Sequence, residues 1–377
     1  MKIAFLGIKT FPPEHGGMET MTSSIVMELA KDPLTSVTVF PLYSSSPITG
    51  LKNLAVLPLH VGNIPYVRSI LGGIAGVLEA FQIKPDVIHL NGLENAYLLP
   101  LLRLLGLKVV LHIHGTKWAV SEWGGTRFRL SNLPILAGKL FFRINIRFFA
   151  SYAERIVTVN EVALEQMPPR ARRKTEVVYN SLDIRLEENK QLLERQGLSS
   201  GGYLIYIGRI VPLKGLHYLI QAYNRLPHLS LPLVVVGRFD PTRPYHAYLK
   251  ELAAGVDVRF IGAFYGDSAY TMIKNARLLI LPSETEGMAV SILEAGLLKT
   301  PVLASDIPEN VRLWGETIHY FRNKDIDSLT GSLDVLARDD SRCSSKVPRA
   351  LEVANNKFNH RDQMAKLLGV YKKCLTG

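Results

Sequence analysis

The feature that most constrains the fold of this chain is an alternation of short apolar runs with segments of helical periodicity. KIAFLG (residues 2–7) and KVVLHIHG (residues 108–115) are two of the apolar runs. Runs of this kind are typical of strands that are buried on both faces. Because helices connect such strands in parallel sheets, the alternation predicts an α/β fold built from βαβ units.

The same alternation begins a second time after a polar, helix-prone passage. IRLEENKQLLERQGLSSGG (residues 184–202) separates two series of strands and helices with similar architecture. A chain of 377 residues is long enough for two domains, each with its own core. We therefore predict an N-terminal domain over residues 1–183 and a C-terminal domain over residues 184–357.

The composition narrows the class of protein and of partner. Hydrophobic residues make up 47% of the chain and charged residues 20%, which is typical of a globular protein. The net charge of +11 indicates an anionic partner, which is a nucleic acid, an anionic lipid or a phosphorylated ligand. The two cysteines, Cys343 and Cys374, have no metal or redox spacing and indicate a reducing compartment. Since no apolar run is long enough for a membrane span or a signal peptide, we expect a cytoplasmic protein.

A pair of glutamates marks the end of one C-terminal strand. In ILPSETEGMAVSILEAGLLKTP (residues 280–301), Glu286 lies in the loop after an apolar run, and Glu294 lies in the helix that follows. A little over two helical turns separate them, so both carboxylates face one crevice if the helix begins near Met288. Ligands bind in this crevice in open α/β sheets. Taken alone, the spacing favours two solvated surface charges, a loop glutamate and a helix glutamate.

A loop with two cations follows the first strand of the second series. GRIVPLKG (residues 208–215) places Arg209 and Lys214 at the end of a strand, next to glycines and before a helix. Two cations at such a place form a clamp for a pyrophosphate, because each adds charge-assisted hydrogen bonds to anionic oxygens. The alternative is a pair of solvated loop cations.

Two features of the N-terminal half also point to a ligand. Gly16 and Gly17 lie between the first strand and its helix, where glycines let a backbone approach a ligand closely. His114 is at the carboxyl end of a central strand, and His112 shares its side of that strand. The alternatives are an ordinary turn at the glycines and a buried, backbone-bonded histidine at residue 114.

One N-terminal segment is basic and apolar at once. Between residues 128 and 153 there is no Asp or Glu, and Lys139, Arg143 and Arg147 recur every four residues. This spacing places them on one helical face, with Phe141, Phe142, Ile146, Phe148 and Phe149 nearby. The pattern predicts attachment to an anionic membrane surface or contact with an acceptor. An ordinary domain helix with a solvated cationic side is the alternative.

GRIVPLKG, followed further along by PSETEGMAVSILEA (residues 282–295), resembles the donor-site signature of retaining glycosyltransferases of the GT4 family, on the GT-B fold. The resemblance covers most of the chain. It includes the diglycine loop, HG after a central strand, YNSLD before the linker, Gly237 after VVV and Gly262 in FIG. The opening segment and HGTKW are similar to those of bacterial rhamnosyltransferase-like enzymes.

The resemblance implies an architecture and an activity. It implies two Rossmann-like domains that face each other across a cleft, with the final helix crossing back so that residues 358–377 complete the first domain. It implies transfer of a sugar from a UDP-, dTDP- or GDP-linked donor to a glycan or lipid-linked acceptor, with retention and without a metal ion or cofactor. The family context is cell-surface polysaccharide synthesis, so we expect a cytoplasmic protein that is peripheral on the inner face of the cell membrane.

The resemblance also implies roles for individual residues. Arg209 and Lys214 bind the donor pyrophosphate and stabilise charge as the nucleotide leaves. Glu294 accepts hydrogen bonds from ribose hydroxyls, Glu286 lies by the donor sugar, and His114 lines the cleft near the reacting centre. The other residues assigned to donor binding are Gly16, Gly17, Gly208, Gly237, Gly262, Gly287, Met288 and Ala289.

The chain departs from the family pattern at two positions and contains one further acidic motif. Ala289 stands where family members often have glycine, and its Cβ narrows the space near the sugar. Ser181 stands where the family has glycine in a turn that needs positive φ. Asp325 and Asp327 form a D-x-D motif just before a helix, which we interpret as helix capping rather than metal binding.

Other functions remain open at this point. A nucleotide-sugar epimerase shares the fold but does not require the two glutamates together with Arg209 and Lys214. A basic nucleic-acid-binding protein agrees with the net charge, but no recognised RNA or DNA motif occurs, so we expect no nucleic-acid partner. A two-domain binding protein without catalysis differs from the enzyme only in lacking donor turnover.

Overall fold

The structure is a computed structural model that describes residues 1–13, 16–43, 51–59, 67–115 and 133–376. The described residues form two compact units. The N-terminal unit contains the described residues up to Asn180 together with those from Arg361 onward, and the C-terminal unit contains Ser181–His360. Each large hydrophobic cluster lies within one unit, so each unit has its own core.

In the N-terminal unit, the described residues form a seven-stranded sheet whose paired strands are all parallel. The strand order is β3-β2-β1-β4-β5-β6-β7, so the chain moves outward from β1 and then returns to its other side. The change of direction between β1 and β4 is a topological switch point, where open α/β sheets bind ligands. The strands are β1 (Lys2–Ile8), β2 (Ser36–Pro41), β3 (Leu54–Val56), β4 (Val87–Asn91), β5 (Val109–Ile113), β6 (Arg155–Thr158) and β7 (Thr175–Val177).

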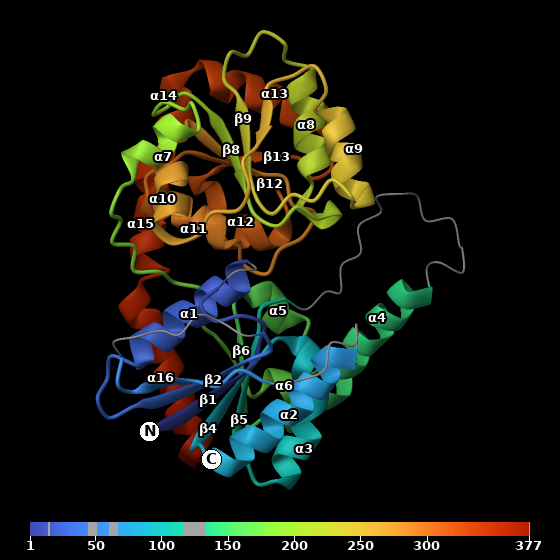
Figure 1. The fold of residues 1–377 in the computed structure, drawn as a ribbon, viewed down its shortest axis with the longest axis vertical. Coiled ribbons are helices and arrows are strands. Elements are labelled where there is room, and N and C mark those ends of the chain that lie inside the picture. The colour runs from blue at the N-terminus through green and yellow to red at the C-terminus, as the bar shows by residue number, and fades with distance from the viewer. Residues whose placement is uncertain (14–15, 44–50, 60–66, 116–132, 377) are drawn as a thin grey trace. The chain divides into compact units, whose positions relative to one another are not determined.

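Helices cover both faces of this sheet (Figure 1). On one face, α1 and α16 share a buried cluster with the sheet, in which Leu367 of α16 packs together with Phe5 of β1. On the other face, α2, η1 and α3 bury their apolar residues against the sheet. The packing of α16 confirms the prediction that the final helix returns to the N-terminal domain. The bounds are α1 (Gly17–Leu29), α2 (Val67–Ile83), η1 (Leu93–Leu98), α3 (Leu99–Leu104) and α16 (His360–Thr376).

The basic, apolar segment is helical throughout its described part, but its helix type changes. α4 (Leu133–Ile144) passes into a π-helical turn, η3 (Asn145–Phe149), and then into a 3-10 turn, η4 (Ala150–Tyr152). At the change, the buried side chain of Asn145 donates a hydrogen bond to the Phe141 carbonyl oxygen at 3.0 Å. Two short helices follow, α5 (Glu161–Glu165) and α6 (Pro169–Arg172).

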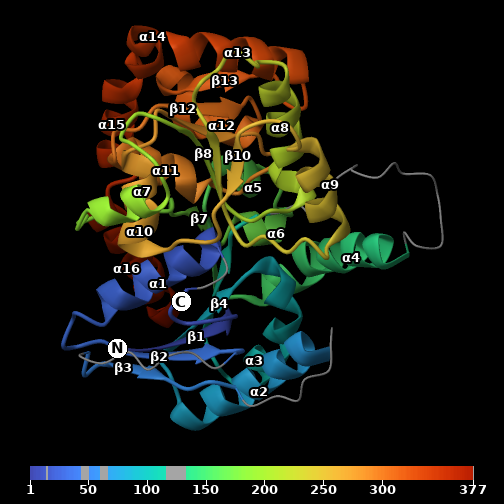
Figure 2. The same cartoon turned by 45° about the horizontal axis from the view of Figure 1, so that its top comes forward.

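The C-terminal unit repeats the plan of the first. Its described residues form a six-stranded parallel sheet in the order β10-β9-β8-β11-β12-β13, which places a second switch point between β8 and β11. α8 and α9 lie on one side of this sheet, and α10 and α11 lie on the other (Figure 2). The strands are β8 (Leu204–Ile207), β9 (Leu233–Val236), β10 (Val258–Phe260), β11 (Leu278–Leu281), β12 (Val302–Ser305) and β13 (His319–Phe321).

The helices of the C-terminal unit lie between and after these strands. They are α7 (Lys190–Arg195), η5 (Pro212–Lys214), α8 (Leu216–Asn224), α9 (Pro244–Leu252), α10 (Gly266–Lys274), α11 (Val290–Leu297), α12 (Pro308–Trp314), η6 (Gly315–Thr317), α13 (Ile326–Arg338), α14 (Asp340–Ser344) and α15 (Val347–Asn356). The two parallel sheets with helices on both faces confirm the predicted α/β class with two Rossmann-like folds. Among the described helices of the whole chain, none is long and apolar enough to cross a membrane.

Candidate active site

The loop after β8 is held in place by backbone contacts and by one buried tyrosine. The Gly208 amide donates to the Val236 carbonyl oxygen at 2.9 Å, and the Tyr206 hydroxyl donates to the Arg209 carbonyl oxygen at 2.8 Å. The side chain of Arg209 is exposed and has no hydrogen-bond or ion-pair partner among the described residues. A fixed backbone thus presents an available guanidinium at the end of β8. Sequence reasoning missed Tyr206 because a tyrosine in an apolar run looks like an ordinary core residue.

The loops after β8 and β11 pack directly against each other. Gly215 has φ +67, and a Cβ at this position would collide with the Pro282 carbonyl oxygen. The Glu284 amide donates to the Leu213 carbonyl oxygen at 2.9 Å. Positive φ and the lack of space both require glycine at 215. This close approach brings together two loops that are distant in sequence, at the switch point of the C-terminal sheet.

Lys214 and Glu286 form an ion pair between these two loops. The ammonium contacts the Oε1 atom of Glu286, and their side chains are only 20% and 8% exposed. Burial raises the pKa of the neighbouring Tyr206 hydroxyl well above its ordinary value, and the Glu286 carboxylate raises it further while Arg209 lowers it. Both charges therefore lie close to Tyr206, so Arg209, Lys214 and Glu286 occupy one small region.

The glycines after β9 and β10 fix the same edge of the sheet. The Gly237 amide donates to the Gly262 carbonyl oxygen at 2.8 Å. A Cβ at Gly237 would collide with the Gly208 carbonyl oxygen, and Gly262 has φ +85. The structure therefore gives these glycines a role in loop packing, which lets the loops after β8, β9 and β10 lie close together.

The second glutamate lies in α11, one turn from its start. α11 begins at Val290, so the expected start near Met288 is two residues too early, and Ala289 is its N-cap in an extended conformation with φ −68°. Gly287 is half-buried, and Met288 and Ala289 are buried. The Glu294 carboxyl group has no hydrogen-bond partner within the described parts of the chain. Burial raises its pKa to about 7.

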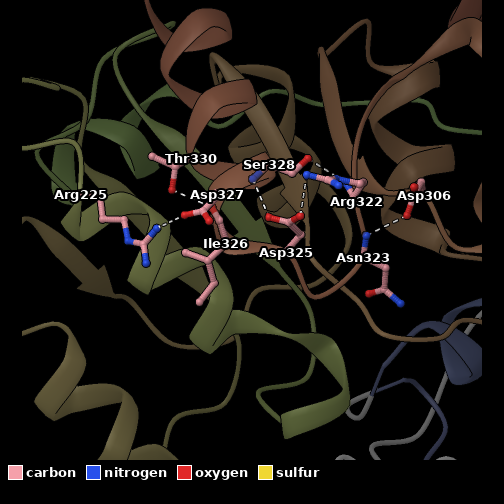
Figure 3. Close-up of polar contacts among 9 residues, drawn as sticks. All are labelled: Arg225, Asp306, Arg322, Asn323, Asp325, Ile326, Asp327, Ser328 and Thr330. Atoms are coloured by element: carbon pink, nitrogen blue, oxygen red, sulfur yellow. Dashed lines mark hydrogen bonds and ion pairs between the residues drawn. The ribbon is translucent and has the colours of Figure 1, made fainter.

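The D-x-D motif is a helix cap (Figure 3). Asp325 is the N-cap of α13, where its Oδ1 accepts from the Ser328 amide at 2.8 Å and its Oδ2 pairs with Arg322 at 2.9 Å. Asp327 pairs instead with Arg225 of the neighbouring α8 end. The predicted capping role of Asp325 is confirmed, because its carboxylate accepts from the Ser328 amide. Asp327 has a separate partner, Arg225, and does not cap the helix. Among the described residues, no group of three or more His, Cys, Asp or Glu is arranged to hold a metal ion.

Gly16 and Gly17 form the start of α1 in the N-terminal unit. Gly16 is the N-cap with φ +137, a backbone conformation that favours glycine, and Gly17 is the first helical residue. The Gly16 carbonyl oxygen accepts from the amides of Glu19 and Thr20, each at 3.1 Å. The diglycine thus lies between β1 and α1, as predicted, on the β1 side of the switch point between β1 and β4.

His114 immediately follows β5, and its ring has no hydrogen bond to a backbone group of the described residues. Its Nε2 lies 3.4 Å from Oδ1 of Asn91, and its ring stacks on that of His112 with centroids 4.1 Å apart. Burial lowers the pKa of His114 to about 4, so the ring is neutral at physiological pH. Gly16, Gly17 and His114 belong to the N-terminal unit, whereas the arginine, lysine and glutamates belong to the C-terminal unit.

Ser181 adopts no positive φ and contacts Nδ1 of His360 at 3.2 Å through its hydroxyl. The turn that the family resemblance led us to expect at this position is therefore not strained by the missing glycine.

The basic segment exposes both cations and apolar side chains. Arg143 and Arg147 are exposed, while the side chain of Lys139 lies outside the described residues. Leu140, Phe141 and Phe148 are also exposed, at 59%, 38% and 59%. Other aromatics of this segment pack in the core of the unit, namely Phe142 and Phe149. The segment therefore has a core side and an amphipathic outer side.

A second exposed apolar stripe, which sequence reasoning missed, runs along the surface of α2. Its residues recur at helical spacing, and all are more than a third exposed: Ile70, Ile74, Leu78 and Phe81. Tyr97 lies between the two surfaces, since its hydroxyl donates to the Ile70 carbonyl oxygen at 3.4 Å and its ring centroid lies 6.0 Å from that of Phe141. The signal that could have found this stripe was the helical spacing of apolar residues within 67–83.

Two family models match the chain. Residues 15–186 match the model described as Glycosyltransferase Family 4, and residues 190–350 match the model described as Glycosyl transferases group 1. Among curated proteins, the O-antigen chain mannosyltransferase B of Escherichia coli is 25% identical over 231 residues, which are 60% of this chain and 57% of that protein. The chain spans little more than half of the length of this and other curated relatives that it matches.

Solved structures match along the whole chain. The sucrose-phosphate synthase of Thermosynechococcus elongatus has a TM-score of 0.81 at 18% identity, covering 100% of this chain and 99% of that one. Anabaena HepE in complex with UDP-glucose has a TM-score of 0.74 at 18% identity, covering 98% of this chain and 99% of that one. On the strength of the two family matches and of this likeness in fold, the chain belongs to the GT4-type glycosyltransferases and has the GT-B fold.

Proposed function

We propose that this protein transfers a sugar from a nucleotide-sugar donor to a glycan or lipid-linked acceptor, with retention, in cell-surface polysaccharide synthesis. The observation that carries the proposal is the group formed by Arg209, Lys214 and Glu286 at the switch point of the C-terminal sheet. An exposed guanidinium and a half-buried ammonium in the loop after β8, next to the end of the adjacent strand β11, suit a diphosphate. In this proposal the domain of residues 184–357 binds the donor, and residues 1–183 with 358–377 bind the acceptor.

The ion pair leaves Lys214 available to a donor. An ammonium has three hydrogen-bond donors, and Glu286 takes one of them. Lys214 is therefore held at the site before the donor arrives, with donors left for phosphate oxygens. Together with Arg209 it compensates the negative charge that develops as the nucleotide leaves, which is the work a metal ion does in other enzymes. We infer that transfer needs no metal.

In this proposal the two glutamates bind different parts of the donor. Glu286, held at the end of β11 next to Lys214, accepts from hydroxyls of the sugar. Glu294, a half-buried residue of α11, accepts from the ribose. HepE was solved with UDP-glucose, which supports a nucleoside diphosphate sugar as the class of donor. The transferred sugar is a hexose or a rhamnose, and the Ala289 methyl group restricts the space beside it.

If the acceptor is lipid-linked, the protein must work at the surface of the membrane that holds the acceptor. The outer side of α4 and η3 combines Arg143 and Arg147 with exposed aromatic side chains, and the apolar stripe of α2 adjoins it through Tyr97. Cations attract anionic headgroups, and apolar side chains insert shallowly. We propose that the protein works in the cytoplasm at the inner face of the membrane, without a nucleic-acid partner.

The proposal is tested by removing the two cations. We expect Lys214→Ala and Arg209→Ala each to lower kcat by about 10²–10³, because each deletes a preorganised donor to a developing oxyanion. Transfer from UDP-, dTDP- and GDP-sugars to membrane-extracted acceptor gives the rates. Lys250→Ala and Arg195→Ala are matched controls, since both cations are exposed on helices of the same unit. Near-normal turnover in both site variants would contradict the proposal. Interconversion of donor sugars without transfer would indicate an epimerase instead.

A further inference from the structure

A line of buried polar rings connects the final helix to His114. The hydroxyl oxygen of Tyr371 in α16 lies 2.6 Å from Nδ1 of His89, and Nε2 of His89 lies 3.1 Å from Nδ1 of His112. The ring of His112 then stacks on that of His114, with an interplanar angle of 29°. Tyr371, His89 and His112 are at most 2% exposed, so no bulk solvent competes with these contacts.

The three imidazoles are uncharged. Burial lowers the pKa of His89 to about 3 and that of His114 to about 4, and it holds the pKa of His112 well below the ordinary value. A neutral imidazole has one N–H donor and one bare nitrogen acceptor. The direction of each hydrogen bond in the line therefore determines which nitrogen carries the proton.

The line permits two arrangements of protons. If the Tyr371 hydroxyl donates to His89 Nδ1, then His89 donates from Nε2 to His112, and both histidines carry the proton on Nε2. If Tyr371 accepts, both carry it on Nδ1. Either way His89 and His112 share one tautomer, and the tyrosine hydroxyl is the group that biases the choice.

His112 has a single polar anchor. Its Nε2 is buried and has no hydrogen-bond partner among the described residues, so the bond from Nδ1 to His89 alone fixes the ring. Within the described parts of the chain, the His114 ring has one weak hydrogen bond, the 3.4 Å approach of Nε2 to Asn91 Oδ1. The amide of Asn91 is oriented by its own donation to the Leu6 carbonyl oxygen at 3.2 Å. Since the amide oxygen accepts, His114 carries its proton on Nε2 and has Nδ1 bare.

We propose that Tyr371, acting through His89 and the stacked ring of His112, positions the His114 ring at the carboxyl end of β5, where the contact with Asn91 leaves Nδ1 bare as an acceptor. Tyr371, His89 and His112 are positioning residues, because they are buried and only His114 reaches the end of the strand. The return of α16 to the N-terminal sheet then supports the reacting site as well as the core. This inference rests on the proposed function, which places His114 beside the reacting sugar.

The test combines ring ¹⁵N NMR of histidine-labelled protein with kinetics of Tyr371→Phe. In the wild type, we expect His89 and His112 to show the same tautomer and His114 to show the Nε2–H form. In Tyr371→Phe we expect the His112 and His114 ring signals to shift, and kcat to fall about tenfold with the donor KM unchanged, because small misplacements of a reacting group cost rate rather than binding. Tyr203→Phe is the matched control, since Tyr203 is equally buried and donates to the Met272 carbonyl oxygen at 2.6 Å in the other unit.

Opposite tautomers at His89 and His112 in the wild type would overturn the inference even if the variant does not fold. So would unchanged ring signals and kcat in Tyr371→Phe, or an equal loss of kcat in Tyr203→Phe. The NMR measurement needs no turnover. A wild-type protein that transfers no sugar but shows the expected tautomers would therefore count against the proposed function and leave the hydrogen-bond line intact.

Discussion

At the scale of single residues, Glu294 is the group whose protonation links the site to pH. An unfolded glutamate titrates near 4.5, whereas burial raises the pKa of Glu294 to about 7 in the folded chain. The folded state therefore binds this proton more tightly, and the contribution of Glu294 to stability is lost as pH rises from about 4.5 to about 7. Ribose hydroxyls that donate to the carboxylate would lower this pKa again.

We accordingly predict that binding of a bare nucleoside diphosphate releases a proton near pH 7 and tightens as pH rises through this value. Titration calorimetry in buffers of different ionisation enthalpy measures the proton. Glu294→Gln should weaken binding of the bare nucleotide and abolish the release. Glu286→Gln is the matched variant, which should keep nucleotide affinity and lose turnover, since its contact is to the sugar. The two roles are misassigned if both variants lose affinity for the bare nucleotide equally.

At the scale of elements, the outer side of α4 and η3 carries the proposed membrane contact. The π-helical turn η3 interrupts the regular helix, yet Arg143 before it and Arg147 within it are both exposed. Phe141 and Phe148 are exposed on the same segment, while Phe142 is buried in the core. Both described cations of the segment therefore stay exposed across the change of helix type.

We predict weak, salt-sensitive binding to anionic vesicles. Each basic residue near such a surface contributes about 1 kcal/mol, so Arg143→Ser with Arg147→Ser should release most of the bound protein in sedimentation with phosphatidylglycerol vesicles. Ile74→Ser with Leu78→Ser should also weaken binding to the vesicles. The salt dependence of binding should stay unchanged, because the lost contact is apolar. Arg170→Ser with Arg173→Ser removes the same charge from another exposed site of the unit and is the control. Equal recovery with neutral and anionic vesicles would make the segment purely structural.

At the scale of the whole molecule, the proposed chemistry depends on side-chain cations. Arg209 and Lys214 lie where the donor phosphates are expected, and the Asp325 and Asp327 carboxylates are engaged in capping and in the pair with Arg225. We predict that transfer survives an excess of EDTA with little change in kcat, measured after removal of trace metal. Loss of activity on chelation that Mg²⁺ or Mn²⁺ restores would contradict the metal-independent mechanism.

The sequence by itself determined the features that depend on local patterns. Short apolar runs and helical spacing predicted the strands and helices of both units, because side-chain periodicity reports which faces are buried. The segments GRIVPLKG and PSETEGMAVSILEA indicated the family, since their glycines and charges lie close together along the chain. The capping role of Asp325 was also predictable, because a helix cap is a contact within a few residues.

Only the tertiary structure decided which distant residues meet. The order of the strands placed β8 next to β11, and the collision that excludes a side chain at Gly215 shows how closely their loops pack to bring Lys214 to Glu286. The same holds for Tyr371, which reaches His89 only because the last helix packs on the first sheet. Burial, and with it the raised pKa of Glu294, is likewise a property of everything packed around a group rather than of its neighbours in sequence.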